Sequence, residues 1–229
     1  MKNLVKKLFF LRKITRALKL NSFIFSIIYK KNHYEELFNV RFSEKINEGY
    51  CVYDIGANMG YYSILYSKIV GQGGIIYSFE PSLINFNKLQ ENVKEYANIQ
   101  TYNMGIGNMN SRLFLSQGTD DFGATSKILI EETESGNWVT IKTIDSFVET
   151  NKYPNAIKID VEGYEFEVVE GALATLMNSD LKVVGIEIHT EILESRKLKD
   201  PIKKIENHLS NAGFEIEWTD FSHIVAYRK

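Results

Sequence analysis

One stretch decides the fold that this chain predicts: Val52-Tyr53-Asp54-Ile55-Gly56-Ala57-Asn58-Met59-Gly60. Its first residues continue an apolar run from Cys51, of the kind that forms a strand buried on both faces. Gly56 then permits a tight turn, and Gly60 lets a helix start against a ligand without a Cβ in the way. A helical pattern follows at once in residues 61–70. Strand, glycine turn and helix together predict the nucleotide-binding corner of a doubly wound α/β sheet.

A second apolar run, residues 75–79, ends in Glu80, and an acidic residue there can hydrogen-bond a ribose diol. A nicotinamide dinucleotide would need its pyrophosphate under Gly-x-Gly-x-x-Gly, but Asn58 stands in place of the second glycine. Asp54 would also repel an anion. S-adenosylmethionine carries no phosphate, and an aspartate favours its ammonium and sulfonium. The corner therefore predicts S-adenosylmethionine as the cofactor and disfavours a dehydrogenase.

The predicted cofactor site has three parts. The glycine turn is expected to hold the methionine end, and the carboxylate of Glu80 to accept hydrogen bonds from both ribose hydroxyls. Residues 103–106, at the end of the third predicted strand, are expected to face the adenine. The predicted cofactor-binding residues are Asp54, Gly56, Asn58, Gly60, Glu80, Asn103 and Ile106.

Four ionisable residues fall in two pairs, Asp160 with Glu162 and Glu187 with His189, each at the end of an apolar run. In extended chain, residues two apart point to the same face. If the two strands are neighbours, the four side chains gather at the carboxyl edge of the sheet, where ligands bind in this architecture.

This cluster suits the removal of a proton from an alcohol that receives a methyl group. A histidine with an unperturbed pKa near ~6.5, oriented by a carboxylate, suits a general base. We therefore predict His189 as the base, with Asp160 and Glu162 lining the site. Structural roles compete with this hypothesis: Glu162 as a cap or ion pair, and His189 as a strand-end histidine. The same groups could also hold a divalent cation, but a general base deprotonates an alcohol without one, so no metal is predicted.

Composition excludes several classes of protein. The chain has 229 residues, a net charge of −2 and 44% hydrophobic residues, which favours one ordinary domain and no nucleic-acid partner. The single cysteine, Cys51, fits a reducing compartment. No apolar run approaches the ~20 residues that span a bilayer, and Arg12 and Lys13 interrupt the first run too early for a signal peptide. A cytoplasmic protein is expected.

Residues 1–48 are expected to be a basic helical cap that precedes a catalytic domain of residues 49–229. Residues 1–31 contain nine Lys/Arg and no Asp/Glu, with leucine and isoleucine at spacings of three or four. Such a segment packs on its own domain or on a second copy, as in a homodimer. Alternatively, it is a basic amphipathic helix on an anionic surface, peripheral to the inner face of a membrane.

Four segments in order resemble the FkbM family of S-adenosylmethionine-dependent methyltransferases: Val52–Gly60, Phe79-Glu80-Pro81, Ile157–Gly163 and Ile186–His189. The resemblance spans about residues 50–190. It implies the seven-stranded, mostly parallel Rossmann-like sheet of a class I methyltransferase, with an antiparallel last strand. A predicted antiparallel pair, residues 214–218 and 224–227, would supply that strand.

The resemblance also implies an O-methyltransferase that acts on a hydroxyl of a sugar or another secondary metabolite. The acceptor is thus expected to be a small molecule or a glycan, and the polar stretch 116–137 is expected to be a loop that contacts it. The alternative is a non-catalytic S-adenosylmethionine-binding module or scaffold. The presence of Asp160, Glu162 and His189 counts against it, because a protein without activity has no reason to keep such a polar cluster.

Overall fold

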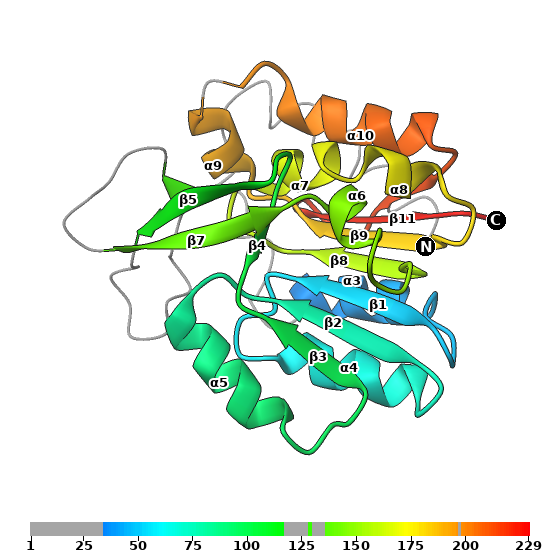
Figure 1. Cartoon of the computed structure of the whole chain (residues 1–229). Helices are drawn as coiled ribbons and strands as arrows, with labels where there is room; N and C mark the ends of the chain where they lie inside the picture. Colours follow the sequence, from blue (N-terminus) through cyan, green and yellow to red (C-terminus); the bar gives the residue numbers. More distant parts are fainter. Residues whose placement is uncertain (1–33, 117–127, 130–135, 197) are drawn as a thin grey trace.

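The structure is a computed structural model that describes residues 34–116, 128–129, 136–196 and 198–229. A seven-stranded sheet forms its centre, in the order β10-β11-β9-β8-β1-β2-β3 (Figure 1). The strands are β1 (Cys51–Ile55), β2 (Ile75–Phe79), β3 (Ile99–Tyr102), β8 (Ala156–Ile159), β9 (Val183–Glu187), β10 (Glu215–Trp218) and β11 (His223–Tyr227).

The direction of the strands confirms the predicted class I methyltransferase sheet. Neighbouring strands from β3 through β1 and β8 to β9 are all parallel. The last strand, β11, is antiparallel to both of its neighbours, β9 and β10. The chain runs outward from β1 through β2 to β3, and it then returns to place β8 on the other side of β1. The topology therefore switches between β1 and β8.

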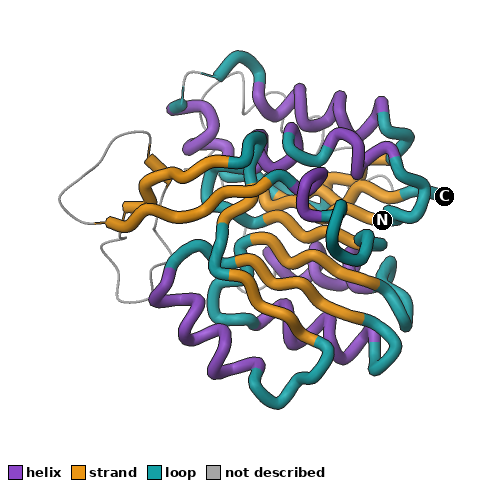
Figure 2. The backbone as a smooth tube through the Cα atoms, viewed as in Figure 1, coloured by secondary structure: helices purple, strands orange, loops and turns teal. Residues whose placement is uncertain are grey.

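Helices cover both faces of the sheet, as Figure 2 shows by the purple segments on either side of the orange strands. The helices are α3 (Tyr34–Ser43), α4 (Tyr61–Val70), α5 (Leu83–Val93), α6 (Ile144–Phe147), α7 (Glu165–Glu170), α8 (Leu173–Met177), α9 (Thr190–Ser195) and α10 (Pro201–Asn211). Because strand side chains alternate, Val52 of β1 belongs to the buried cluster that includes residues of α3 and α4, whereas Tyr53 belongs to the cluster on the other face, where its ring contacts Phe147 of α6. The core strands are accordingly apolar on both faces.

A second, four-stranded sheet stands beside the first and was not predicted as a sheet. Its order is β4-β7-β5-β6, with β4 (Gly105–Ile106), β5 (Ser111–Ser116), β6 (Ile128–Leu129) and β7 (Gly136–Lys142). The predicted loop 116–137 is therefore wrong at residues 116, 128–129 and 136–137, which are strand. Its remaining residues lie outside the described ones.

The predicted N-terminal cap falls mostly on residues outside the described ones. The part that is described includes α3, whose Phe38 and Phe42 are buried against β9 and β11. On the other side of the same helix, Leu37 and Val40 are exposed. Among the described residues, no helix is both long enough and apolar enough to cross a bilayer.

Candidate active site

A cleft opens at the carboxyl ends of β1, β2 and β8. It holds about 730 Å³ of empty space, part of which is open to solvent. The lining residues come from the ends of these strands and the segments after them, from α5, and from β4 and β5: Ile55, Gly56, Asn58, Phe79, Glu80, Pro81, Asn85, Met104, Gly105, Ile106, Leu115, Asp160, Val161 and Glu162. Of the ten residues predicted for the site, six line this cleft.

The turn after β1 needs its glycines for two different reasons. Gly56 has a φ of +80°, and a Cβ there would lie 1.7 Å from the backbone oxygen of Asp160. The turn and the β8 edge thus touch backbone to backbone beneath the cleft. Gly60, with a φ of +91°, is buried outside the lining, and a Cβ there would meet Leu89 of α5. The structure thus gives Gly60 a role in packing against α5, whereas the sequence predicts that it approaches a ligand.

Glu80 presents a buried carboxylate to the cleft, with 6% of the residue exposed. Its Oε2 accepts the backbone N–H of Asn58 at 2.9 Å, and its Oε1 accepts that of Ser82 at 2.8 Å. Burial raises the pKa of Glu80 to about 7, although the two hydrogen bonds favour the charged form. Each oxygen keeps a lone pair, so the carboxylate can accept from two further hydroxyls, as the predicted ribose contact requires.

Two predicted cofactor ligands lie outside the cleft lining. Asp54 is fully buried within β1, where it accepts a hydrogen bond from Ser63 Oγ at 2.6 Å. Asn103 donates to the backbone oxygens of Glu80 and Pro81. Asp54 thus sits under the turn, and Asn103 fixes the strand end that carries Glu80. Ile106 lines the cleft, as predicted for a residue of the adenine side.

Lys158 is a buried cation that the sequence analysis did not single out. Its ammonium lies 3.1 Å from Asp160 Oδ2 and 3.8 Å from Asp54 Oδ1, with 2% of its side chain exposed. Burial opposes its charge, but the two carboxylates outweigh burial and raise the pKa of Lys158. The signal for it was present: a lysine inside an otherwise apolar strand is buried only when it is paired.

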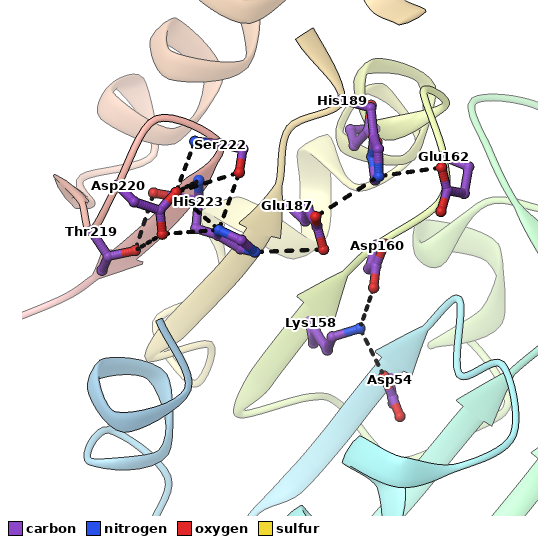
Figure 3. A network of polar contacts seen from close by, with 11 residues as sticks. Asp54, Lys158, Asp160, Glu162, Glu187, His189, Thr219, Asp220, Ser222 and His223 are labelled. Carbon is purple, nitrogen blue, oxygen red and sulfur yellow. Dashed lines mark hydrogen bonds and ion pairs between the residues drawn. The ribbon is translucent and has the colours of Figure 1, made fainter. Parts of the chain in front are cut away.

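The two predicted pairs of ionisable residues meet at the carboxyl edge of β8 and β9 (Figure 3). His189 Nε2 lies 3.3 Å from Glu162 Oε2 and 3.9 Å from Glu187 Oε1. Asp160 and Glu162 line the cleft, whereas His189 stands behind Glu162 with 18% of its side chain exposed. Asp160 and Glu162 do not share a face through strand alternation, as the sequence predicts. The strand β8 ends at Ile159, and the backbone turns at Glu162, which has a φ of +50°.

A further carboxylate, Glu165, orients the imidazole and was not predicted. It is fully buried at the start of α7, and its Oε1 lies 2.7 Å from His189 Nδ1. The same oxygen accepts the backbone N–H of Gly163 at 2.9 Å. Because an ionised carboxylate only accepts, this contact places a proton on Nδ1 and leaves Nε2 to gain or lose one.

The charge around His189 changes the expected basicity. Burial lowers the pKa of an imidazole, but the hydrogen bond to Glu165 and the nearby Glu162 and Glu187 outweigh it and raise the pKa of His189 to about 9. The expectation of an unperturbed pKa near ~6.5 is therefore wrong. Burial likewise raises the pKa of Glu162, with His189 acting in the opposite direction.

Asp160, Glu162 and His189 each offer one ligand atom within 4.8 Å of the others, a spacing that would also suit a cation. The same groups already have partners in the described part of the chain. Lys158 neutralises Asp160, while Glu162 and Glu165 face the two nitrogens of His189. These ion pairs account for the cluster as an acid–base network.

Unpaired acceptors show what the rest of the cleft suits. Asn58 Oδ1 and Asn85 Oδ1 are buried in the lining and have no hydrogen-bond partner among the described residues. Together with Glu80 they form an acceptor-rich wall. S-adenosylmethionine brings donors in its ammonium, its ribose hydroxyls and its adenine amino group, so the residues present fit this cofactor.

Comparisons with known proteins agree with this fold and site. A family model described as "Methyltransferase FkbM domain" matches residues 54–216. The hexuronic acid methyltransferase AglP of Haloferax volcanii is 27% identical over 175 residues, which cover 71% of this chain and 69% of that protein.

Two solved structures show the same fold. Aeropyrum pernix fibrillarin with natively bound S-adenosyl-L-methionine has a TM-score of 0.50 at 16% identity, over 80% of this chain and 67% of that one. Precorrin-6y C5,15-methyltransferase from Geobacter metallireducens has a TM-score of 0.52 at 14% identity, over 85% and 88%.

Proposed function

Because the chain belongs to the FkbM family of S-adenosylmethionine-dependent methyltransferases, we propose that it methylates a hydroxyl oxygen of a carbohydrate or secondary metabolite. The observation that carries this proposal is the acid–histidine cluster at the rim of the cleft that fits the cofactor. A relative named for a hexuronic acid supports a carbohydrate as the acceptor class.

The cofactor, when bound, supplies a methyl group on a sulfonium, which is already a good leaving group. The chain must therefore hold the cofactor and acceptor in line and remove one proton. For the first task we assign Glu80 to the ribose hydroxyls and Asn58 to the methionine end. Gly56 keeps the turn close to β8, so that the cofactor and the cluster share one cleft.

For the second task we assign His189 as the general base, with Asp160 and Glu162 beside the acceptor. The acceptor O–H bond would break as its oxygen forms the new C–O bond, the methyl–sulfur bond of the cofactor would break at the same time to leave a neutral thioether, and the proton would pass to Nε2 of neutral His189. Glu165 holds Nδ1–H throughout, at 2.7 Å. Glu162, 3.3 Å from Nε2, stabilises the imidazolium that results.

The raised pKa of His189 makes Glu162 the alternative candidate for the general base. At neutral pH most of the His189 population is protonated and cannot accept a proton, whereas Glu162 lines the cleft with 40% of its side chain exposed. The two bases predict different pH profiles. With His189, turnover rises up to pH about 9; with Glu162, turnover does not follow the titration of His189.

Residues 1–48 are assigned to a helical cap on the sheet, through which contact with a second copy or an anionic membrane surface would occur. The burial of Phe38 and Phe42 under α3 supports a cap. The exposed Leu37 and Val40 offer an apolar surface for the contact.

Radiolabelled S-adenosylmethionine tests the acceptor class. The full chain is incubated with a panel of methyl glycosides, and with the same glycosides after complete O-methylation as the matched control without hydroxyls. We expect label in the free glycosides and none in the blocked ones. Equal labelling of both panels, or label that moves only to amines, would refute a hydroxyl acceptor.

A further inference from the structure

A second buried histidine lies behind the cluster. His223 opens β11, and 1% of its side chain is exposed. Its Nδ1 lies 2.9 Å from Asp220 Oδ2, and its Nε2 lies 3.5 Å from Glu187 Oε2. The other oxygen of Glu187, Oε1, lies 3.9 Å from Nε2 of His189. Glu187 thus stands between two imidazoles (Figure 3).

We propose that His223 is a positioning residue that acts through Glu187 to set the orientation and the proton affinity of His189. The proposal rests on the proposed function in one respect, the role of His189 as base. The contact between the two histidines through one carboxylate is a feature of the structure itself.

The surroundings of His223 hold its ring in one orientation. Asp220 also accepts the backbone N–H groups of Ser222 and His223 at 2.8 and 2.9 Å, so the Asp220 carboxylate is fixed by the turn before β11. Phe38 of α3 packs against the imidazole, with ring centroids 4.7 Å apart. A histidine needed only to close this turn would use Nδ1 alone. Here Nε2 reaches across to the last residue of β9.

The charges on every side decide the direction of the effect. His189 faces Glu165 on α7, Asp160 and Glu162 after β8, and Glu187 on β9.

Among the described residues, His223 faces Asp220, Glu187 and the apolar Phe38 ring, and it also interacts electrostatically with Asp160. Burial opposes its charge, but Asp220 and Glu187 raise the pKa of His223 to about 9, so it is a cation at neutral pH. This cation shares Glu187 with His189. The positive charge of His223 therefore reduces the stabilisation that Glu187 gives to protonated His189.

Opposite substitutions should therefore move His189 in opposite directions. In His223→Gln, Glu187 acts on His189 alone, and one nearby positive charge is gone, so His189 binds its proton more tightly. In Glu187→Gln, one negative charge is lost, so His189 releases its proton more easily. A neighbouring unit charge in a partly buried site changes proton affinity by about one pH unit, or about tenfold.

The test is the titration of the His189 ring in the full chain, followed by NMR of the Cε1–H signal and assigned with His189→Gln. We expect the midpoint to rise in His223→Gln and to fall in Glu187→Gln. His208→Gln, on α10 outside the network, is the matched control and should leave the midpoint unchanged. Turnover at pH 7 should fall about tenfold in His223→Gln, with little change at a pH where His189 is already neutral.

Unchanged midpoints in both variants, or midpoints that move in the same direction, would overturn the proposal. A loss of turnover in His223→Gln that persists undiminished above the His189 midpoints of both proteins would also overturn it, because that is the result of misfolding or loss of packing. The NMR titration needs no methyl transfer. If the midpoints move as expected but the turnover of His189→Ala equals that of the parent, His223 sets a property of His189 that the reaction does not use, and the base assignment fails instead.

Discussion

Replacement of Glu80 tests the acceptor-rich wall of the cleft, because it removes the acceptor of two observed hydrogen bonds and of two that we propose for the cofactor. Two come from the backbone N–H groups of Asn58 and Ser82, and two are expected from the ribose hydroxyls. Glu80→Ala removes every acceptor, and unmet partners of a charged group cost about 1–3 kcal/mol. The affinity for S-adenosylhomocysteine should fall by roughly 5- to 150-fold, measured by isothermal titration calorimetry.

The same carboxylate predicts a pH dependence of cofactor affinity. Burial raises the pKa of Glu80 to about 7 in the folded protein. Hydroxyl donors bind the charged carboxylate, so cofactor binding pulls this pKa down, and affinity rises with pH through about 7. At pH 6 affinity should be about tenfold lower than at pH 8. Because the folded pKa lies above the ordinary value, the charged form costs stability above about pH 7 and this cost disappears below the ordinary pKa.

Glu91→Gln supplies the control, since Glu91 is exposed on α5 and pairs only with nearby Lys94 among the described residues. It should bind S-adenosylhomocysteine as the parent does at every pH. Parental affinity in Glu80→Ala, or the same affinity at pH 6 and pH 8 in the parent, would show that Glu80 does not hold the ribose.

Three further predictions follow from the remaining contacts. Parent turnover should rise about tenfold per pH unit from pH 7 to its plateau near the raised pKa of about 9 for His189. His189→Ala should lose ~10²–10⁴-fold in turnover, and a chelator should change the turnover of neither protein. A parent profile that does not follow the titration of His189 would point to Glu162. Lys158→Met leaves Asp54 and Asp160 without their cation and should cost about 3–5 kcal/mol in urea unfolding, compared with Lys182→Met on the surface; an unchanged midpoint would contradict the ion pairs. Removal of residues 1–31 should abolish salt-sensitive pelleting with anionic vesicles, or change the mass measured by light scattering; no change in either would exclude both roles.

The sheet could be predicted because its strands are apolar on both faces and its turns are marked by glycine. Gly56 has a left-handed φ and lies against the Asp160 backbone, so no residue with a Cβ fits this position. The glycine in the sequence therefore indicates the turn directly. The second sheet could not be predicted as such. β4 and β6 have two residues each, too few to show a period, and their partners are distant in sequence.

The site was predicted in part, because motif spacing shows which residues are near an edge but not where they point. Asp54 belongs to the same motif as Gly56, yet its side chain is buried away from the cleft lining and contacts Ser63 and Lys158. The basicity of His189 depends on Glu165, 24 residues earlier, and such a contact has no sequence signature. The contact of His223 with Glu187 has no sequence signature either, because it depends on the antiparallel pairing of β11 with β9.

The most direct measurement follows a ¹³C-labelled methyl group from S-adenosylmethionine into product, with the parent and His189→Ala compared at the same saturation of cofactor. The carbon chemical shift distinguishes a methyl ether from an ester, an N-methyl or an S-methyl group. The parent should form a methyl ether on the carbohydrate acceptor, and His189→Ala should bind the cofactor with parental affinity but form little ether. Label on a carboxylate or a nitrogen, or equal ether formation by both proteins, would contradict hydroxyl methylation with His189 as the base.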